Sequence, residues 1–404
     1  MDETKLRLVA ISLLTVMIML VVVFVIFLKS SWIFFTILGI VVAGSFGVLV
    51  WFFTRYQKWS SENRTSGDGI SSIKRRSRVL TKYSYKDLTL ATDDFSTIVG
   101  QGGSGSVYKG VFKDGTHVAV KRLDGQEHGE RVFRAEMAAI GWAHHRNLVR
   151  LYGYCIVPRG PRFLVYEFVP NGSLDRWIFP RKPSKNHASG CLSWKLRYKV
   201  AIDVARALYY LHNDCQSRIL HLDVKPENIL IDENFFAVVS DFGLAKLMGK
   251  EEKMVVTRIR GTREYLAPEW ILDHGVSAKS DVYSYGLVLL EMIGGRRNVN
   301  SQSDMISSDY FPKIVFDKMK AGKLMEVVDK RVLEKGNVVE EEVKKMVYVA
   351  LWCIQEKVIL RPNMGQVVNM LEGHLPVTEP PESNMFFLNV LLYNNTEKVQ
   401  VICQ

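Results

Sequence analysis

The sequence of 404 residues predicts an α+β fold of two lobes, a small β-rich N-terminal lobe and a large helical C-terminal lobe, preceded by one or two transmembrane helices. Two long uncharged runs at the start of the chain predict the transmembrane part. A glycine-rich stretch flanked by alternating residues predicts the β-rich lobe. The remaining length suffices for a second, larger lobe, whose helical character is inferred from the motifs that it carries.

The chain is basic, with 53 Lys and Arg against 42 Asp and Glu and a formal net charge of +11. Such a balance is compatible with nucleic acid, an anionic membrane surface or phosphate ligands. The sequence has no zinc-ligand spacing and no pattern typical of RNA-binding or helix-turn-helix domains, so we expect no nucleic-acid partner. Its five scattered cysteines argue against a disulfide framework and indicate a reducing compartment.

Residues 8–28 and 32–53 contain no charge, and each run is long enough to cross a bilayer as a helix, which takes about 20 apolar residues. A buried core helix is the alternative, but a soluble core rarely needs two such runs separated only by Lys29-Ser30-Ser31. The second run is therefore predicted to be a transmembrane helix. The first, after a short N-terminus of residues 1–7, is either another span or a signal sequence. Its length and poor cleavage site favour the span.

Residues 54–94 are polar and basic, and we interpret them as a juxtamembrane linker that ends in a short helical lead-in, residues 84–95. The positive-inside rule places this basic side, and everything after it, in the cytosol. The same basic residues can lie on anionic lipid headgroups. The end of the chain, residues 376–404, is predicted to be a loose tail.

Residues 99–107 read Val-Gly-Gln-Gly-Gly-Ser-Gly-Ser-Val, a G-x-G-x-x-G-x-V loop. Alone this string is weak, because dinucleotide-binding folds carry a similar one at the start of a helix. Here the residues that follow alternate like a strand, and Asp114-Gly115 marks a hairpin turn. A glycine-rich hairpin can bring backbone N–H groups against phosphates without side-chain obstruction, which favours a phosphate-binding loop.

Lys121 ends the second strand of this hairpin, residues 116–121. A surface charge at a strand end is the alternative interpretation. Next to the glycine loop, however, Lys121 can neutralise the α- and β-phosphates of a nucleotide. A buried lysine needs a carboxylate partner, and we expect Glu136, on a helix predicted over residues 130–143, to be that partner.

The most specific string in the chain is residues 221–230, His-Leu-Asp-Val-Lys-Pro-Glu-Asn-Ile-Leu, which fits H-x-D-x-K-x-x-N. This pattern serves phosphoryl transfer. It predicts that Asp223 accepts the proton of a substrate hydroxyl, that Lys225 meets the γ-phosphate, and that Asn228 holds a magnesium ion. Asp241 begins an Asp-Phe-Gly string and is predicted to be the main magnesium ligand.

In this order and at these spacings the strings resemble the protein kinase family, and within it the plant receptor-like kinases of the Pelle type. The resemblance covers residues 95–375 and is close to S-domain-type receptor kinases and to short relatives without an ectodomain. Further marks of it are residues 145–151, 163–168, 261–270, 280–286 and 351–355.

The resemblance implies a two-lobed protein kinase fold that uses ATP and Mg. It also implies phosphorylation of serine or threonine in protein substrates, a preference indicated by Lys225 and Thr262. It implies signalling at the plasma membrane with the kinase domain in the cytoplasm, together with a partner receptor or a homo-oligomer.

The resemblance also assigns the nucleotide site. Tyr166 would be the gatekeeper, and Glu167 and Val169 would offer hinge backbone groups to adenine. Val107 and Ala119 would form the adenine ceiling and Leu230 its floor. The predicted nucleotide-binding residues are Val99, Gly100, Gln101, Gly102, Gly103, Ser104, Gly105, Val107, Ala119, Lys121, Glu136, Glu167, Val169 and Leu230. The resemblance further implies supporting contacts: Asp281 under the catalytic loop, an ion pair of Glu269 with Arg361, and an apolar column of Ile140, His221 and Phe242.

Two residues depart from the family pattern. Leu222 stands before the catalytic aspartate, where arginine is common, and Glu264 stands where relatives usually carry glycine. Because Leu222 offers no cation to an activation-segment phosphate, we expect phosphorylation of Thr257 to change intrinsic activity little. The opposing argument is that nearby cations could replace that arginine, namely Lys246, Arg258 and Arg260.

Two other classes of function compete with a kinase. A pseudokinase-like signalling scaffold is opposed by the intact catalytic and magnesium-binding residues. An oxidoreductase using a dinucleotide is opposed by the strand, rather than helix, that follows Gly105.

Overall fold

The computed structural model describes residues 80–382, apart from residues 104, 159, 181–189, 250, 253, 273 and 300–309. These residues belong to the second of two compact units, which begins at Val79. The predicted spans 8–28 and 32–53 lie outside the described residues, as does the linker before residue 80. Of the helices that the structure describes, none is both long and apolar enough to cross a bilayer.

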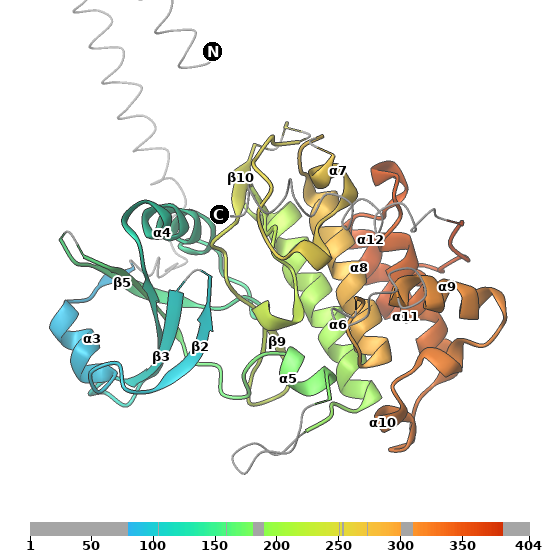
Figure 1. The fold of residues 1–404 in the computed structure, drawn as a ribbon, viewed down its shortest axis with the longest axis horizontal. Helices are drawn as coiled ribbons and strands as arrows, with labels where there is room; N and C mark the ends of the chain where they lie inside the picture. The colour runs from blue at the N-terminus through green and yellow to red at the C-terminus, as the bar shows by residue number, and fades with distance from the viewer. Residues whose placement is uncertain are drawn as a thin grey trace, which may run out of the picture. The chain divides into compact units, whose positions relative to one another are not determined.

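The small lobe is built on one twisted sheet (Figure 1). Its strands in the described part of the chain are β1 (Thr81–Lys82), β2 (Ile98–Gly102), β3 (Gly105–Val111), β4 (His117–Leu123), β5 (Leu151–Ile156) and β6 (Arg162–Glu167). They lie in the order β1-β5-β6-β4-β3-β2. Neighbours are antiparallel except β1 and β5, which are parallel. The predicted hairpin with its turn at Asp114-Gly115 is therefore present as β3 and β4, and the glycine loop joins β2 to β3.

The tight turn between β2 and β3 requires glycine at position 105. Gly105 has a φ of 133°, and a Cβ there would lie 1.9 Å from the carbonyl oxygen of Arg122 on β4. Any side chain would push β3 off β4. This close approach fixes where the glycine loop leaves the sheet.

Residues 80–94, which the sequence assigns to the linker, pack on this sheet. Helix α3 (Tyr85–Ala91) begins at Ser84, whose side chain accepts a hydrogen bond from the Asp87 backbone N–H while the Asp87 carboxylate accepts one from the Ser84 N–H. This capping box satisfies two N–H groups that a helix end leaves unpaired. Leu88 is fully buried in a cluster with Val118, Val120, Phe163 and Val165.

Helix α4 (Gln126–Ile140) covers the other side of the small lobe (Figure 1). It starts four residues before the predicted limit of 130 and ends three before 143. Gly125, with a φ of 81°, makes the turn into the helix. Val132, Phe133 and Ile140 are buried in the main core, so α4 is fixed by its apolar face.

The large lobe is mainly helical (Figure 1). Its helices are α5 (Asp175–Ile178), α6 (Trp194–Tyr209), α7 (Pro268–Ile271), α8 (Ala278–Gly294), α9 (Phe311–Lys320), α10 (Lys330–Leu333), α11 (Glu340–Cys353) and α12 (Met364–Glu372). Helix α8 is buried along most of its length and packs against α11, while α6 packs against α12. At Gly286 of α8, a Cβ would lie 2.7 Å from the Cβ of Cys353, so glycine permits this close packing.

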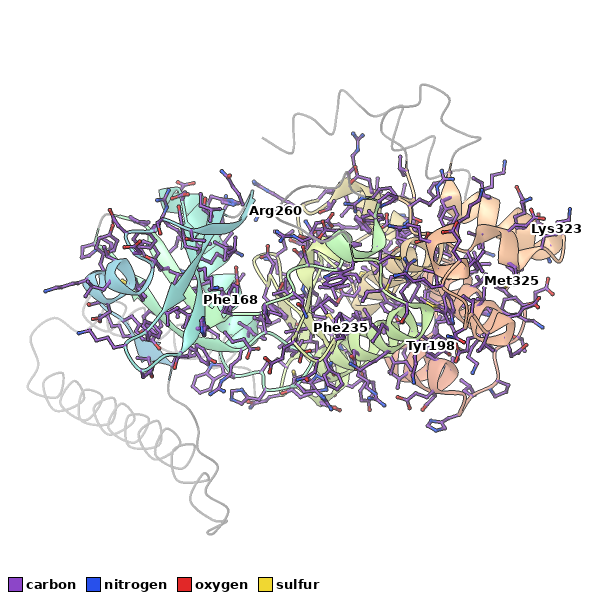
Figure 2. The ribbon with its side chains drawn as sticks, turned by 90° about the horizontal axis from the view of Figure 1, so that it is seen from below. Phe168, Tyr198, Phe235, Arg260, Lys323 and Met325 are labelled. Carbon is purple, nitrogen blue, oxygen red and sulfur yellow. The ribbon has the colours of Figure 1, made fainter. Side chains whose placement is uncertain are left out.

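Short strands lie near the junction of the two lobes. Strands β8 (Ile229–Ile231) and β9 (Ala237–Val239) form a hairpin, and β7 (Arg218–Leu220) pairs with β10 (Lys246–Met248). Phe168, the first residue after β6, lies on the side of the small lobe next to the large lobe, whereas Tyr198 and Phe235 lie within the large lobe (Figure 2). The loops after β7 and β9 contain the predicted catalytic and magnesium-binding residues.

Candidate active site

Lys121 lies in β4 with its side chain buried between two carboxylates. Its Nζ donates to Glu136 Oε1 at 2.7 Å and to Asp241 Oδ1 at 2.8 Å. The predicted pair of Lys121 and Glu136 is thus present, and Asp241 joins it from the loop after β9. The three residues come from a strand, a helix and a loop, so this contact fixes the two lobes against each other.

The charges of this group are mutually dependent. Burial opposes the charge on Lys121, but Asp241 and Glu136 raise the pKa of its ammonium group. Burial likewise opposes ionisation of Asp241, and the Lys121 ammonium overcomes it, lowering the Asp241 pKa to about 2. Burial raises the pKa of Glu136. Asp241 is therefore held as a carboxylate.

Tyr166, the predicted gatekeeper, lies on β6 and contacts Glu136 of this group. Its hydroxyl donates a hydrogen bond to Glu136 Oε2. Both carboxylate oxygens of Glu136 are therefore bound, one to β4 and one to β6. The sequence singles out Tyr166 and Glu136 separately, but its pattern does not reveal this contact.

The catalytic-loop residues converge on Asp223. Lys225 Nζ lies 2.8 Å from Asp223 Oδ2, and Asn228 Nδ2 donates to that oxygen at 2.9 Å and to the Asp223 carbonyl at 2.8 Å. Thr262 Oγ1 donates to Asp223 Oδ1 at 3.0 Å and accepts from Lys225 Nζ at 2.6 Å. In the sequence Thr262 is only a mark of the family, whereas the structure places it in direct contact with Asp223.

The backbone of this loop is strained and is held from below. Leu222 has a φ of 64°, a left-handed conformation that costs a residue with a side chain of this kind about 1–3 kcal/mol. The buried carboxylate of Asp281 accepts from the backbone N–H of His221 at 2.9 Å and of Leu222 at 2.8 Å. His212 Nε2 lies 2.8 Å from the same carboxylate, a partner that the sequence did not indicate. The predicted support of the loop by Asp281 is thus present.

Two more of the expected contacts are present, the ion pair of Glu269 with Arg361 and the contact of His221 with Phe242. Arg361 and Glu269 form a buried two-point ion pair, with both N···O distances at 2.8 Å. The His221 and Phe242 rings lie 4.9 Å apart, centre to centre. Ile140 is buried in the same core as Phe242.

The other predicted nucleotide-binding residues lie in both lobes and in the connection between them. Val99, Gly100, Gln101 and Gly102 belong to β2, Gly105 and Val107 to β3, Ala119 to β4, Glu167 to the end of β6, and Leu230 to β8. Gly103 lies in the turn between β2 and β3, and Val169 follows β6. Ser104 lies outside the described residues. Arg176 of α5 donates to the Val99 carbonyl at 3.3 Å and so connects the lobes near this loop.

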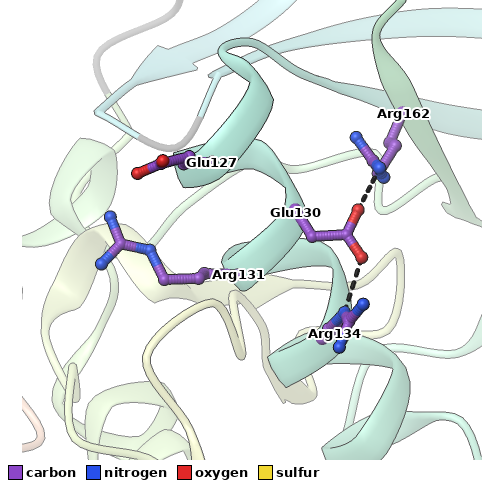
Figure 3. Close-up of a pocket in the computed structure, with 5 residues that line it drawn as sticks. All are labelled: Glu127, Glu130, Arg131, Arg134 and Arg162. Carbon is purple, nitrogen blue, oxygen red and sulfur yellow. Dashed lines mark hydrogen bonds and ion pairs between the residues drawn. The ribbon is translucent and has the colours of Figure 1, made fainter. Parts of the chain in front are cut away.

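A hollow on the outer face of α4 contains none of these residues (Figure 3). It is lined by charged side chains, and Glu130 lies between Arg134 and Arg162, with Glu130 Oε1 at 2.5 Å from Arg134 Nε. The remaining lining residues are Glu127 and Arg131. The Glu130–Arg162 ion pair attaches α4 to β6, and the predicted site residues lie elsewhere.

The chain is similar to known protein kinases. The model of the protein kinase domain matches residues 94–371, close to the predicted limits of 95 and 375. A probable receptor-like protein kinase of Arabidopsis thaliana is 50% identical over 408 residues, which cover 97% of this chain and 90% of that protein.

Relatives with an additional lectin-type name match over a smaller share of their length. A G-type lectin S-receptor-like serine/threonine-protein kinase of Arabidopsis thaliana is 51% identical over 303 residues, 75% of this chain and 36% of that protein. One of Oryza sativa subsp. indica is 43% identical over 309 residues, 76% of this chain and 37% of that protein. The chain thus spans about a third of these relatives. On these matches, this chain belongs to the protein kinase family and is a plant receptor-like serine/threonine protein kinase.

Proposed function

We propose that the chain is a membrane-anchored kinase that transfers the γ-phosphate of ATP to serine or threonine in proteins, as part of signal transduction. The observation that carries this proposal is the convergence of two groups of side chains. Lys121, Glu136 and Asp241 form one buried ionic group, and Asp223, Lys225, Asn228 and Thr262 form a hydrogen-bonded group. The first is suited to nucleotide phosphates and the second to the accepting hydroxyl.

In this proposal each side chain of the site has a defined role. Lys121 neutralises the α- and β-phosphates and keeps α4 in place through Glu136. Asp223 accepts the hydroxyl proton and orients the attacking oxygen. Lys225 stabilises charge on the transferred phosphoryl group. Thr262 is a positioning residue, because it contacts both Asp223 and Lys225.

Asn228 and Asp241 would hold magnesium. Both supply the hard oxygen donors that this ion prefers. The Asn228 amide nitrogen is bound to Asp223, which leaves its oxygen as the end available to a metal. Asp241 is held as a carboxylate at neutral pH. When bound, magnesium would neutralise charge on the phosphate oxygens.

An assay of phosphate transfer from γ-labelled ATP tests this function. Wild-type chain solubilised in detergent should label itself and a serine-containing protein substrate, and Asp223→Asn should retain a folded domain with almost no transfer. A matched control is Asp232→Asn, outside the site, which should retain activity. Substantial labelling by Asp223→Asn would show that the proton acceptor is wrongly assigned.

Membrane anchoring is a separate part of the proposal. It rests on the uncharged runs 8–28 and 32–53, the basic flank after them and the relatives' description as receptor-like kinases. We propose two spans with both chain ends in the cytosol, at the plasma membrane. In sealed vesicles, tags at both ends should then be protected or cleaved together. A tag at Met1 found only on the exoplasmic side would rule out the two-span arrangement.

A further inference from the structure

Arg297 lies just beyond the end of α8 and contacts four side chains from different segments. Its Nη1 donates to the Tyr265 hydroxyl at 2.8 Å, and its Nη2 donates to the Glu227 carboxylate. Nη1 also lies 3.9 Å from Glu291 Oε2. The guanidinium carbon is 4.0 Å from the centre of the Phe179 ring. A planar cation is thus held by two carboxylates, a phenol oxygen and a ring face, a set of groups suited to a guanidinium ion.

This set lies beside the proton acceptor. Glu227 belongs to the same loop as Asp223 and precedes Asn228, which is hydrogen-bonded to Asp223. Tyr265 is three residues after Thr262, which also binds Asp223. A protein substrate must bring its hydroxyl to Asp223, so the surface flanking these two segments is where the rest of its chain passes.

The set is also accessible from solvent. The side chain of Glu227 is 37% exposed and that of Arg297 is 43% exposed, while Glu291 beneath them is 2% exposed. The Glu291 carboxylate is fixed by the Tyr265 hydroxyl at 2.7 Å and the Asn298 N–H at 3.1 Å. Without Arg297, three groups would face the surface along which the substrate chain passes: the partly exposed Glu227 carboxylate, the buried Glu291 and the Phe179 ring. Burial alone would lower the pKa of Arg297, but the hydrogen bond that it donates to Glu227 and the charges of Glu227, Tyr265 and Glu291 raise that pKa.

We propose that Arg297 occupies a subsite of the substrate groove that would otherwise select an arginine or lysine side chain, and so prevents this kinase from preferring basic substrates at that position. The inference rests on the proposed phosphotransfer to proteins and makes Arg297 a specificity-determining residue. Arg297 supplies from within the chain the cation that a basic substrate side chain would otherwise place in this subsite. A basic substrate residue then meets a filled and largely neutralised pocket and gains no binding energy from it.

Serine-centred peptide libraries, varied at one position at a time, test this inference through the ratio of kcat/KM for arginine to that for glutamine. At the position that meets this subsite, the wild-type ratio should stay within about twofold of one. In Arg297→Gln it should rise at least fivefold at one position. The double variant Arg297→Gln/Glu227→Gln should lose most of that gain, because the exposed carboxylate is gone.

Arg296→Gln is the matched control. It removes the same charge from the neighbouring residue, whose guanidinium lies over the Phe311 ring instead, 5.2 Å from its centre. Its peptide preference should equal that of wild type. Equal gains in Arg296→Gln and Arg297→Gln would indicate a general charge effect and overturn the subsite.

If Arg297→Gln does not fold, Arg297→Lys replaces it. A lysine cannot bind Tyr265 and Glu227 together through a planar fork, so a gain of at least twofold is expected at the same position. A folded, active variant whose peptide preference is unchanged at every position overturns the proposal. Absence of transfer by the wild-type chain would instead contradict the proposed function, so the two failures are distinguishable.

Discussion

Leu222 offers a test of whether apolar packing, rather than a phosphate, holds the activation segment, residues 241–269. Leu222 is only 5% exposed and lies in a cluster with Met248 and Val276, among other apolar residues. Val255 of the segment exchanges two backbone hydrogen bonds of 2.9 Å with Val276. The segment is thus attached to the large lobe by uncharged contacts at the position where an arginine would bind a phosphate.

Truncating this side chain should loosen the segment. Leu222→Ala removes buried carbon atoms and should lower the free energy of unfolding by about 2–5 kcal/mol, depending on how far the cavity collapses. Leu222→Met preserves most of the volume and should cost less than about 1.5 kcal/mol. Urea unfolding of the kinase domain measures both values. At a temperature where both variants are folded, kcat/KM of Leu222→Ala should fall well below that of Leu222→Met.

Thr257→Ala should leave kcat/KM within about threefold of wild type, and phosphatase treatment should do the same. A tenfold fall, which corresponds to about 1.4 kcal/mol of barrier, would refute the reasoning. Such a result would point to a phosphate site made by other cations. Burial and the neighbouring guanidinium groups of Arg131 and Arg258 lower the pKa of Arg260, so these three residues would be the first to replace by glutamine.

Three further predictions concern the site and its support. Arg361→Met should lower the free energy of unfolding by about 3–5 kcal/mol, because it leaves the Glu269 carboxylate buried without its partner; adding Glu269→Gln should recover part of that loss in the same urea titration, and full additivity would contradict the pairing. Burial raises the pKa of Glu291 to about 7, so this group stabilises the fold below its unfolded value of 4.5 and loses that contribution as the pH rises through 7. Between about pH 5 and 9, wild type should therefore lose up to about 3 kcal/mol more stability than Glu291→Gln; equal pH profiles would show that this group is not perturbed. Phosphotransfer should fall to near zero, without loss of the folded domain measured by circular dichroism, in each of the variants Lys121→Met, Asp223→Asn and Asp241→Asn.

Short sequence motifs predicted those parts of the fold that depend on contacts between residues close together in the sequence. The hairpin of β3 and β4, whose second strand carries Lys121, could be predicted from the Asp114-Gly115 turn and the alternating residues, because strand pairing across a short turn is a local event. The limits of α4 were displaced by a few residues, since its ends are set by glycines and by contacts with the sheet. The packing of residues 80–94 was missed, because a polar segment gives little sign that one buried residue, Leu88, attaches it to the sheet.

By itself, the sequence determined which chemical groups this protein has and how those within one loop are spaced, as in Asp223, Lys225 and Asn228. It also indicated long-range pairs, Lys121 with Glu136 and Glu269 with Arg361, where a resemblance or a need for charge compensation named the partner. Only the tertiary structure decided contacts that no local rule constrains. Thr262 on Asp223, His212 under the catalytic loop and Arg297 among the carboxylates join segments tens of residues apart. Such pairs depend on the path of the whole chain, which buried helices such as α8 fix, and not on the period of any single helix or strand.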